Sequence, residues 1–332
     1  MRRRRASTPP TSRLPRRARA WRRGPARARS AVDAAPSPTL LYGVCLRCIL
    51  SRTAQLMAVQ RGLESCRPPA SRLFEDPLCR RFVSPRWRAV LTAARVAPVR
   101  VAVERLYDRV AGPGPRASAV ARTRLIDDLL ADLAPGAEQV VILGAGLDGR
   151  AQRLGALAGR RAFEVDHPDT QAFKRQRAGS LGVDYVPVDF ERDALTEALR
   201  QAGFDPARRS VFLWEGVTNY LTDAAVAQTL AAIGVLAAPA STLIFTYVDR
   251  AALDPERCPF PEAARWLKGV ARRGEPWIFG LDPASVGESL AGHGLTLTGD
   301  LSTAQAGERY FPGRGRRERG SGLYHVATAA RT

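Results

Sequence analysis

The 332-residue sequence contains few of the residues that build metal centres or disulfide frameworks. It has three histidines and five cysteines, and the cysteines are odd in number and scattered through the chain. Such a distribution argues against structural disulfides and for a reducing compartment. Cys45 and Cys48 form a C-x-x-C pair, but no second pair or nearby histidine completes a zinc site. We therefore expect no metal and a cytoplasmic location.

Long apolar runs are absent as well. The apolar stretch over residues 40–50 is interrupted by Arg47 and begins too far along the chain for a secretory signal peptide. No other run approaches the roughly 20 apolar residues that a transmembrane helix needs. We therefore expect no membrane among the partners of the protein.

Acidic residues are missing from the beginning of the chain, where residues 1–30 hold twelve arginines. Much of the formal net charge of +19 therefore belongs to this segment, which weakens the case for a nucleic-acid partner. The segment cannot bury enough apolar surface to offset its ordering entropy, so we predict a disordered basic tail over residues 1–37. Three roles stay open for it: a solvated extension or artefact of the assumed gene start, a polyanion-binding arm, and a transit-type presequence.

Two patterns divide the remaining chain. Over residues 38–134, leucine and valine recur at helical spacing, which predicts a helical N-terminal cap. Over residues 135–332, short apolar runs alternate with helical stretches, which predicts an α/β fold with a doubly wound, Rossmann-like parallel sheet. Residues 250–290 form a lid-like insertion that is rich in proline and bears two tryptophans.

The C-terminal part contributes two more strand-like segments, LTLTGDLS and GLYHVATAA. No helical pattern separates them, so they should pair antiparallel and complete a sheet of seven strands. A doubly wound sheet with an antiparallel last strand is more typical of methyltransferases than of nicotinamide enzymes, which is an argument from fold analogy alone.

The run VVILGAGLDGRAQRL carries Gly144, Gly146 and Gly149 in the spacing G-x-G-x-x-G. A turn of this kind at the end of a first strand brings the backbone against a nucleotide, commonly a dinucleotide whose pyrophosphate lies at a helix N-terminus. Asp148 is expected in the first helical turn, where its carboxylate would repel a pyrophosphate. S-adenosylmethionine has no phosphate, so this turn is compatible with it.

Acidic residues follow three later strands. Asp166 ends the second strand and suits the hydroxyls of a ribose, whichever nucleoside cofactor is bound. Asp189 and Phe190 follow the third strand, where an acid and an apolar position suit adenine, and Glu215 leaves the fourth strand at the centre of the sheet. Each acid could instead cap a helix or be solvated. Together, they favour a cationic nucleoside ligand over a polyphosphate.

The chain resembles the S-adenosyl-L-methionine-dependent methyltransferases related to leucine carboxyl methyltransferase, in particular a bacterial branch that includes polyketide O-methyltransferases. The resemblance runs from about Ser51 to Ala329. The segments that carry it are SRTAQLMAVQRGLES, RLFEDPLCRRFV, ARTRLIDD, VVILGAGLDGRAQRL, FEVDHP, VPVDF, FLWEGVTNYL and GEPWIFGLDP. The chain departs from the family in its long basic start and in Phe190, where leucine is more usual.

When the functional positions of the family are carried over to this sequence, the resemblance implies one set of residues for the methionine end of the cofactor and another for its nucleoside end. Arg122 would pair with the methionyl carboxylate through two parallel hydrogen bonds, with Arg124 as the competing candidate. Gly144 would line the turn beneath the methionine portion, and Glu215 would stand near the sulfonium.

At the nucleoside end, the resemblance implies that Asp166 holds the ribose. Asp189 and Phe190 would receive the adenine.

These features predict an S-adenosyl-L-methionine-dependent methyltransferase that acts on a carboxylate or hydroxyl of a small metabolite. Two alternatives stay open: an NAD(P)-dependent oxidoreductase that uses the glycine turn, and a basic nucleic-acid-binding protein. Tyr220, Trp266 and Trp277 are candidates to line the acceptor pocket. The sequence identifies no catalytic base, no oligomeric state and no specific acceptor.

Overall fold

The computed structural model describes residues 52–179 and 181–332. The predicted basic tail, residues 1–37, and the pair Cys45 and Cys48 lie outside these ranges. All described residues fall within one compact unit. None of the described helices is long and apolar enough to cross a membrane.

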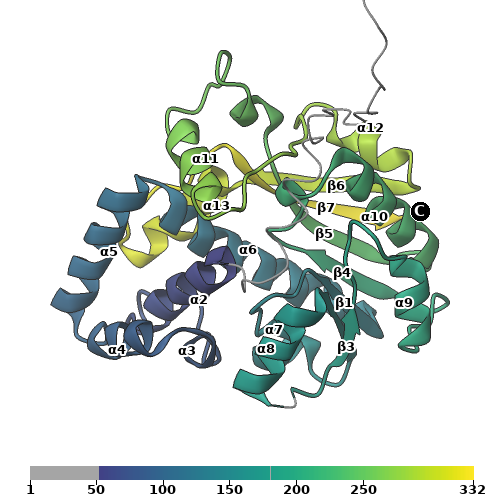
Figure 1. Cartoon of the computed structure of the whole chain (residues 1–332), viewed down its shortest axis with the longest axis horizontal. Coiled ribbons are helices and arrows are strands. Elements are labelled where there is room, and N and C mark those ends of the chain that lie inside the picture. The colour runs from purple at the N-terminus through teal and green to yellow at the C-terminus, as the bar shows by residue number, and fades with distance from the viewer. Residues whose placement is uncertain (1–51, 180) are drawn as a thin grey trace, which may run out of the picture. The chain divides into compact units, whose positions relative to one another are not determined.

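Seven strands form one sheet in the order β3-β2-β1-β4-β5-β7-β6 (Figure 1). Neighbouring strands from β3 to β5 pair in parallel, whereas β7 pairs antiparallel with both β5 and β6. The predicted seven-stranded α/β sheet with an antiparallel last strand is confirmed. The strands are β1 (Gln139–Leu143), β2 (Arg161–Asp166), β3 (Asp184–Pro187), β4 (Ser210–Trp214), β5 (Thr242–Val248), β6 (Leu295–Ser302) and β7 (Tyr324–Arg331).

The three central strands are buried along their whole length. Strands β1, β4 and β5 read QVVIL, SVFLW and TLIFTYV, which are nearly continuous apolar runs rather than alternating ones. Such runs form strands with both faces covered by helices, as parallel sheets require. The apolar composition therefore places these strands in the middle of the molecule.

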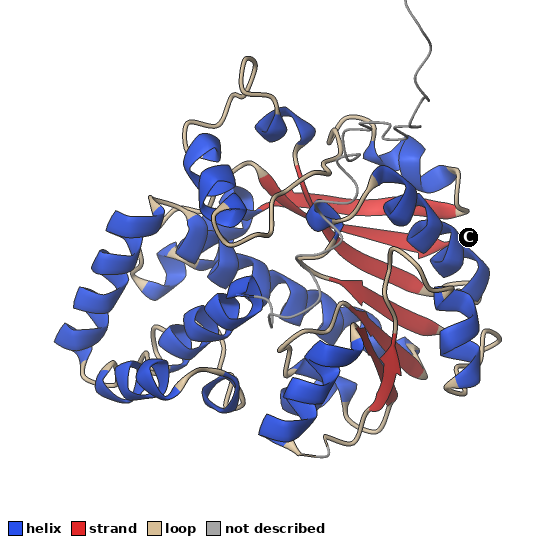
Figure 2. Ribbon diagram, viewed as in Figure 1, coloured by secondary structure: helices blue, strands red, loops and turns tan. Residues whose placement is uncertain are grey.

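Helices cover both faces of the sheet (Figure 2). On one face, α9 (Leu195–Gln201), α10 (Asp223–Leu236) and α12 (Val286–Ala291) pack in a core that includes Trp214 and Phe245. On the other face, α6 (Pro115–Leu133), α7 (Arg150–Arg153) and α13 (Thr303–Tyr310) pack against Ile142 and Leu213. The chain also forms α8 (Pro168–Ala178), which follows β2, and α11 (Ala263–Ala271), within the insertion.

Helix α13 corrects one expectation. The two closing strands were predicted to follow each other without a helix, but α13 lies between β6 and β7. The helix begins at a capping box in which Ser302 and Gln305 exchange side-chain and backbone hydrogen bonds. Its sequence, TAQAGERY, has few large apolar residues, so the helical period is weak. The antiparallel pairing itself was predicted correctly.

Within residues 52–138, five α-helices precede the sheet, in agreement with the predicted helical character of this segment. They are α2 (Arg52–Ser65), α3 (Cys79–Phe82), α4 (Pro85–Ala93), α5 (Ala97–Ala111) and α6. Helix α6 belongs to the cap by sequence, but its buried face packs directly on β1 and β4. The boundary between cap and core at residue 134 therefore stays a prediction. The lid-like role of residues 250–290 also stays a prediction.

A group of buried ion pairs joins the cap helices to the loop before β7. Arg67 pairs with Glu104 at 2.8 Å and with Glu318 at 3.1 Å, and Arg316 pairs with Glu318 at 3.1 Å. We call this group the cap ion network; its members are Glu64, Arg67, Glu104, Arg116, Arg316 and Glu318. Because buried charges are tolerated only when paired, the network holds α2, α5 and α6 against the C-terminal loop.

Substitution Glu318→Gln tests the stabilising effect of this network. Burial raises the pKa of Glu318, but the hydrogen bonds and charge of Arg316 outweigh burial and lower it to about 2. A depressed carboxyl pKa stabilises the folded state above the unfolded pKa, and that contribution is lost as the pH falls through the folded pKa. We expect E318Q to lower the free energy of unfolding at pH 7 by about 1–3 kcal/mol. The difference from the wild type should shrink between about pH 5 and pH 2 in urea unfolding.

The matched control is Glu138→Gln. Glu138 pairs with Arg208 at the surface, and both side chains are more than half exposed. E138Q should change the free energy of unfolding by less than about 0.5 kcal/mol. Equal stability of E318Q and the wild type at pH 7 would contradict the proposed effect.

Candidate cofactor and acceptor site

The strand register brings the predicted site residues to one edge of the sheet. Leu143 of β1 is aligned with Val165 of β2 and with Trp214 of β4. The residues that follow these three, Gly144, Asp166 and Glu215, therefore stand at the same level at the carboxyl ends of the strands. The strand order reverses between β1 and β4, which is where ligands bind in open α/β sheets.

The glycine turn depends on two of its three glycines. Gly144 has φ +62° and Gly146 has φ +45°, values that side-chain-bearing residues rarely adopt. A Cβ on Gly144 would lie 2.2 Å from Cγ2 of Val217, so the turn also needs glycine there to pack against the loop after β4. Gly149 has φ −112° and is not held in the left-handed region.

Asp148 does not occupy the position predicted for it. Helix α7 begins at Arg150 and has four residues, so Asp148 precedes the helix instead of lying in its first turn. Its carboxylate receives hydrogen bonds from the backbone N–H of Arg150 at 2.8 Å and from the Arg150 guanidinium at 2.5 Å. Burial opposes ionisation, but the charges of Arg150 and Arg61 outweigh it and lower the pKa of Asp148. The prediction that Asp148 would repel a pyrophosphate from the first helical turn is therefore wrong. Asp148 lies before the helix, and Arg150 neutralises its charge.

Asp166 faces the glycine turn directly. Its Oδ2 accepts a hydrogen bond from the N–H of Gly146 at 2.5 Å, and its Oδ1 accepts one from the N–H of His167 at 2.7 Å. Burial raises the pKa of Asp166, and these backbone bonds oppose that rise. Thr170 also forms a side-chain hydrogen bond with this carboxylate. A carboxylate has about four acceptor sites, so some acceptor capacity remains for a hydroxyl donor of a ligand.

Arg150 is the centre of the charged part of the site. Its side chain is almost fully buried and contacts three carboxylates: Asp127 of α6 at 2.7 Å, Asp148 of the turn at 2.5 Å, and Glu215 after β4 at 2.5 Å. These contacts raise the pKa of Arg150 against the effect of burial. One guanidinium therefore connects a cap helix, the glycine turn and the centre of the sheet.

Arg122 and Glu215, which were predicted as separate cofactor contacts, form an ion pair. Nε of Arg122 donates to Oε1 of Glu215 at 2.7 Å, and the guanidinium lies 4.8 Å above the ring of Tyr324. Burial opposes ionisation of Glu215, but Arg150 and Arg122 together lower its pKa. Arg124, the competing candidate, instead pairs with Asp128 on the same helix and donates to the carbonyl of Leu73. Arg122 is thus the arginine of this helix that reaches the switch point.

Asp189 and Phe190 lie two and three residues beyond the end of β3. The carboxylate of Asp189 accepts from the N–H of Glu191 at 3.1 Å and is partly exposed, next to Arg192 at 3.7 Å. In the described part of the chain, Asp189 forms no hydrogen bond with Asp166 or Glu215. The ring of Phe190 packs against the core on the α9 and α10 face.

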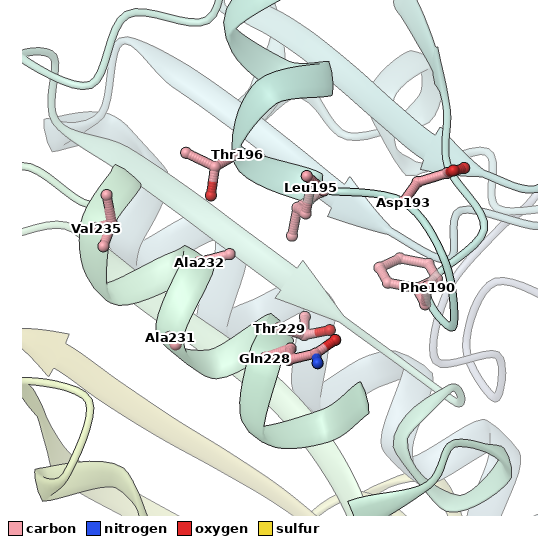
Figure 3. A pocket seen from close by; sticks show the side chains of 10 residues that line it. Phe190, Asp193, Leu195, Thr196, Gln228, Thr229, Ala231, Ala232 and Val235 are labelled. Carbon is pink, nitrogen blue, oxygen red and sulfur yellow. The ribbon is translucent and has the colours of Figure 1, made fainter. Parts of the chain in front are cut away.

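Phe190 also lines a groove of about 380 Å³ between α9 and α10 (Figure 3). Figure 3 shows Phe190 and Asp193 at one end of the groove and Val235 at the other. The lining is mainly apolar and lacks the buried charges that surround Arg150. The groove therefore differs in chemistry from the strand ends around Arg150.

A cluster of aromatic side chains lies next to Arg122. Trp277 of the insertion packs edge-on against Trp266 and Tyr324, with ring centroids 6.3 Å and 5.9 Å apart. Burial raises the pKa of Tyr220 to about 12, and Tyr324 and Trp277 lie near its hydroxyl. We call Tyr220, Trp266, Trp277 and Tyr324 the aromatic cluster. The sequence predicted the first three as pocket residues, and the fold brings them together.

Buried polar groups border the aromatic cluster. Tyr324 Oη donates to Oδ1 of Asn219 at 3.3 Å, while Nδ2 of Asn219 has no hydrogen-bond partner among the described residues although the residue is only 1% exposed. The backbone N–H of Thr53, in the first turn of α2, donates to Glu275 of the insertion at 3.2 Å. The start of the cap and the insertion therefore meet on this side of the site.

Comparison with known proteins decides the family. The family model of leucine carboxyl methyltransferase matches residues 54–234, more than half of the chain, including the glycine turn and both members of the Arg122 and Glu215 pair. The chain belongs to this family. A relative from Frankia alni that is named as an S-adenosyl-L-methionine-dependent methyltransferase is 39% identical over 228 residues, 65% of this chain and 76% of the relative. A similarly named relative from Parafrankia is 37% identical over 243 residues, 71% of this chain and 74% of the relative.

Solved structures agree with this family in fold. A crystal structure titled as a methyltransferase from Thermobifida fusca has a TM-score of 0.51 at 18% identity and covers 70% of this chain and 88% of its own. A duf574 family protein from Streptomyces avermitilis has a TM-score of 0.50 at 17% identity and covers 71% and 91%.

The family confirms the predicted cofactor, S-adenosyl-L-methionine, and the methyltransferase class of this enzyme. The residues present fit that cofactor. A Cβ on Gly146 would have no heavy atom closer than 3.8 Å, and one on Gly216 would have none within 4 Å, so space is open beside the turn. Acceptors at Asp166 and donors at Arg122 border this region. The oxidoreductase and nucleic-acid-binding alternatives are set aside for this methyltransferase.

Sequence reasoning missed Arg150 and Asp127. Arg150 stands directly after Gly149 in the quoted glycine run, but nothing in an arginine-rich sequence distinguishes a buried arginine from an exposed one. Asp127 lies twelve residues before β1 on a helix and gains its role only because α6 packs on the sheet. The spacing of acids along the strands could not reveal either residue.

Substitution Arg150→Met tests the role of this guanidinium in the methyltransferase. It would leave Asp127, Asp148 and Glu215 buried without their shared partner, so we expect the free energy of unfolding to fall by about 3–5 kcal/mol. Arg150→Lys should lose less, because it keeps the charge but not the three-way contact. The control Arg208→Met removes a half-exposed arginine and should change stability by less than about 0.5 kcal/mol. Urea unfolding measures all three, and an R150M protein as stable as R208M would refute the role.

Proposed function

We propose that this methyltransferase transfers the methyl group of S-adenosyl-L-methionine to an oxygen atom, carboxylate or hydroxyl, of a small cytoplasmic metabolite. The observation that carries the proposal is the position of Asn219 Nδ2, a buried donor without a partner among the described residues, beside the aromatic cluster and near the Arg122 and Glu215 pair. The bound cofactor supplies an electrophilic methyl group. The acceptor would lie on the side of the aromatic cluster.

We assign the cofactor residues as follows. Gly144 provides the turn beneath the methionine portion, and Asp166 accepts from the ribose hydroxyls. Arg122 binds the methionyl carboxylate through the guanidinium nitrogens that Glu215 does not use. Glu215 stands at the sulfonium end and acts as a positioning residue, because its charge is already balanced by two arginines.

Asp189 and Phe190 complete the assignment at the adenine. The carboxylate of Asp189 is partly exposed and has acceptor capacity for the adenine amino group. Phe190 provides an apolar position against the ring, and its side chain anchors the loop to the core.

Two features favour a carboxylate acceptor over a hydroxyl. Asn219 Nδ2 and Trp266 Nε1 are buried N–H donors without partners in the described chain, and an ionised carboxylate offers only acceptors. A carboxylate needs no deprotonation, whereas a hydroxyl benefits from a general base. Tyr220 cannot serve as that base at neutral pH, since burial raises its pKa to about 12. The chain's contribution is then orientation of the acceptor and exclusion of water.

The class of acceptor atom can be tested by product chemistry. The enzyme would be incubated with methyl-labelled S-adenosyl-L-methionine and matched panels of small carboxylic acids and the corresponding alcohols and amines. We expect label in a methyl ester, which mild base releases as methanol because esters hydrolyse and ethers do not. Base-stable label on an alcohol would move the acceptor to a hydroxyl. Label on nitrogen or carbon would refute O-methylation.

Substitution Asp166→Ala tests the cofactor assignment. Loss of the carboxylate should weaken S-adenosyl-L-methionine binding by about 1–3 kcal/mol, because ribose hydroxyls are left without their acceptor. Isothermal titration calorimetry with the cofactor and with its demethylated product measures the change. The control Asp169→Ala lies three residues further on, in a largely exposed position, and should bind as the wild type does. Unchanged affinity in D166A would refute the role of Asp166.

A further inference from the structure

Helix α5 buries two of its charged residues and exposes several of its apolar ones. Arg100 and Glu104 are each only 7% exposed, and Glu104 pairs with Arg67 of the cap ion network. Arg116 holds Asp108 of the same helix at 2.8 Å. A surface helix of a globular protein normally has the opposite pattern, with its apolar stripe toward the core.

The outward face of α5 is a continuous apolar stripe. Val99, Ala102, Leu106 and Val110 follow one another at spacings of three and four residues, which puts them on one side of the helix. Val110 is 73% exposed and Leu106 is 62% exposed, and Val96, just before the helix, is 57% exposed. In Figure 1, α5 lies at the outer edge of the described helices. Exposed large apolar side chains that adjoin one another mark interaction surfaces.

Arginines border this stripe. Arg105 and Arg109 each precede a residue of the stripe and together line a depression of about 290 Å³, with Asp108 and Pro113. Every charged residue that is exposed between residues 85 and 110 is an arginine. The two acids in this range are withdrawn, because Glu104 is buried and Asp108 is paired with Arg116. The surface is therefore both apolar and predominantly positive.

We propose that this α5 surface, formed by Val96, Val99, Leu106, Val110, Arg105 and Arg109, binds the surface of an anionic phospholipid bilayer. Helices that lie in a bilayer interface insert an apolar stripe and keep arginines level with the lipid phosphates. Anionic headgroups then add attraction for each basic residue near the surface. The inner charges of α5 do not take part, because Glu104 belongs to the cap ion network, Arg100 lies beside Glu104 and Asp108 is paired with Arg116.

Charge decides between this occupant and two others. A second copy of the chain would bring the same arginines against Arg105 and Arg109, with no exposed acid in this range to receive them. Residues 1–51 contain a single acid, Asp33, among many arginines, so they carry the same sign as the surface. An anionic lipid surface is complementary in both apolar character and charge.

The proposal revises one expectation from the sequence. No membrane partner was expected because no segment is long enough to span a bilayer. A helix that lies on the membrane needs an apolar face, not a spanning length. The face of α5 becomes visible only when the folded structure shows which side of the helix is exposed.

Vesicle co-sedimentation of the full chain tests the proposal. Vesicles of phosphatidylcholine alone would be compared with vesicles that contain about 30% phosphatidylglycerol. We expect binding to the anionic vesicles only, and a loss of roughly tenfold in Val110→Glu. The matched control is Val235→Glu, the same substitution at a valine of α10 that is 62% exposed. Both variants change the net charge equally, and both keep the basic tail.

A second pair of variants separates position from charge. Arg105→Gln with Arg109→Gln should weaken binding to anionic vesicles, whereas Arg192→Gln with Arg208→Gln, at arginines more than half exposed elsewhere, should weaken it much less. Circular dichroism and cofactor binding would show that all variants fold. Equal binding by V110E and V235E would overturn the proposal, because the tail or bulk charge would then account for it.

Two further outcomes would also overturn the proposal. Concentration-dependent dimerisation in analytical ultracentrifugation that V110E abolishes would assign the surface to a second copy. Tighter, V110E-sensitive binding to polyglutamate than to anionic vesicles would assign it to an acidic protein. Neither outcome bears on methyl transfer, whose assays need no vesicles.

Discussion

The site of this methyltransferase depends on the burial of one guanidinium among three carboxylates. Arg150 holds Asp127, Asp148 and Glu215, which come from a cap helix, the glycine turn and the centre of the sheet. In a region of low dielectric, each of these charges would be costly alone, and together they require one another. The same cluster fixes Arg122 through Glu215. This ion cluster therefore sets the geometry of the strand ends where we propose that the cofactor binds.

Arginine serves three different purposes in this chain. At the strand ends it organises carboxylates around the cofactor region, and in the cap ion network it ties α2, α5 and α6 to the C-terminal loop. On the outer side of α5 it borders an apolar stripe. The cap ion network makes this outer stripe possible. Because buried charges hold the inner side of α5 in place, its outer side can carry valine and leucine. Composition alone cannot separate these uses, since all three contribute equally to the net charge.

The aromatic cluster, where we propose that the acceptor binds, differs in chemistry from the strand ends, where we propose that the cofactor binds. The strand ends are rich in carboxylates and guanidiniums, whereas the aromatic cluster offers N–H and O–H donors within apolar surroundings. Arg122 connects the two, because it pairs with Glu215 and stacks over Tyr324. Such a division suits methyl transfer, in which a charged cofactor and an acceptor atom must meet in a site from which water is excluded.

The sequence alone determined the parallel sheet, the glycine turn and the acids at the strand ends, because continuous apolar runs and glycines with positive φ are local requirements. Strand order then aligned Gly144, Asp166 and Glu215. Only the tertiary structure decided that Arg150 is buried, that Glu215 pairs with Arg122, that α13 separates the last two strands and that α5 exposes its valines. Each of these depends on what another element presents across a packed interface, and residue spacing along one segment carries no information about its partner.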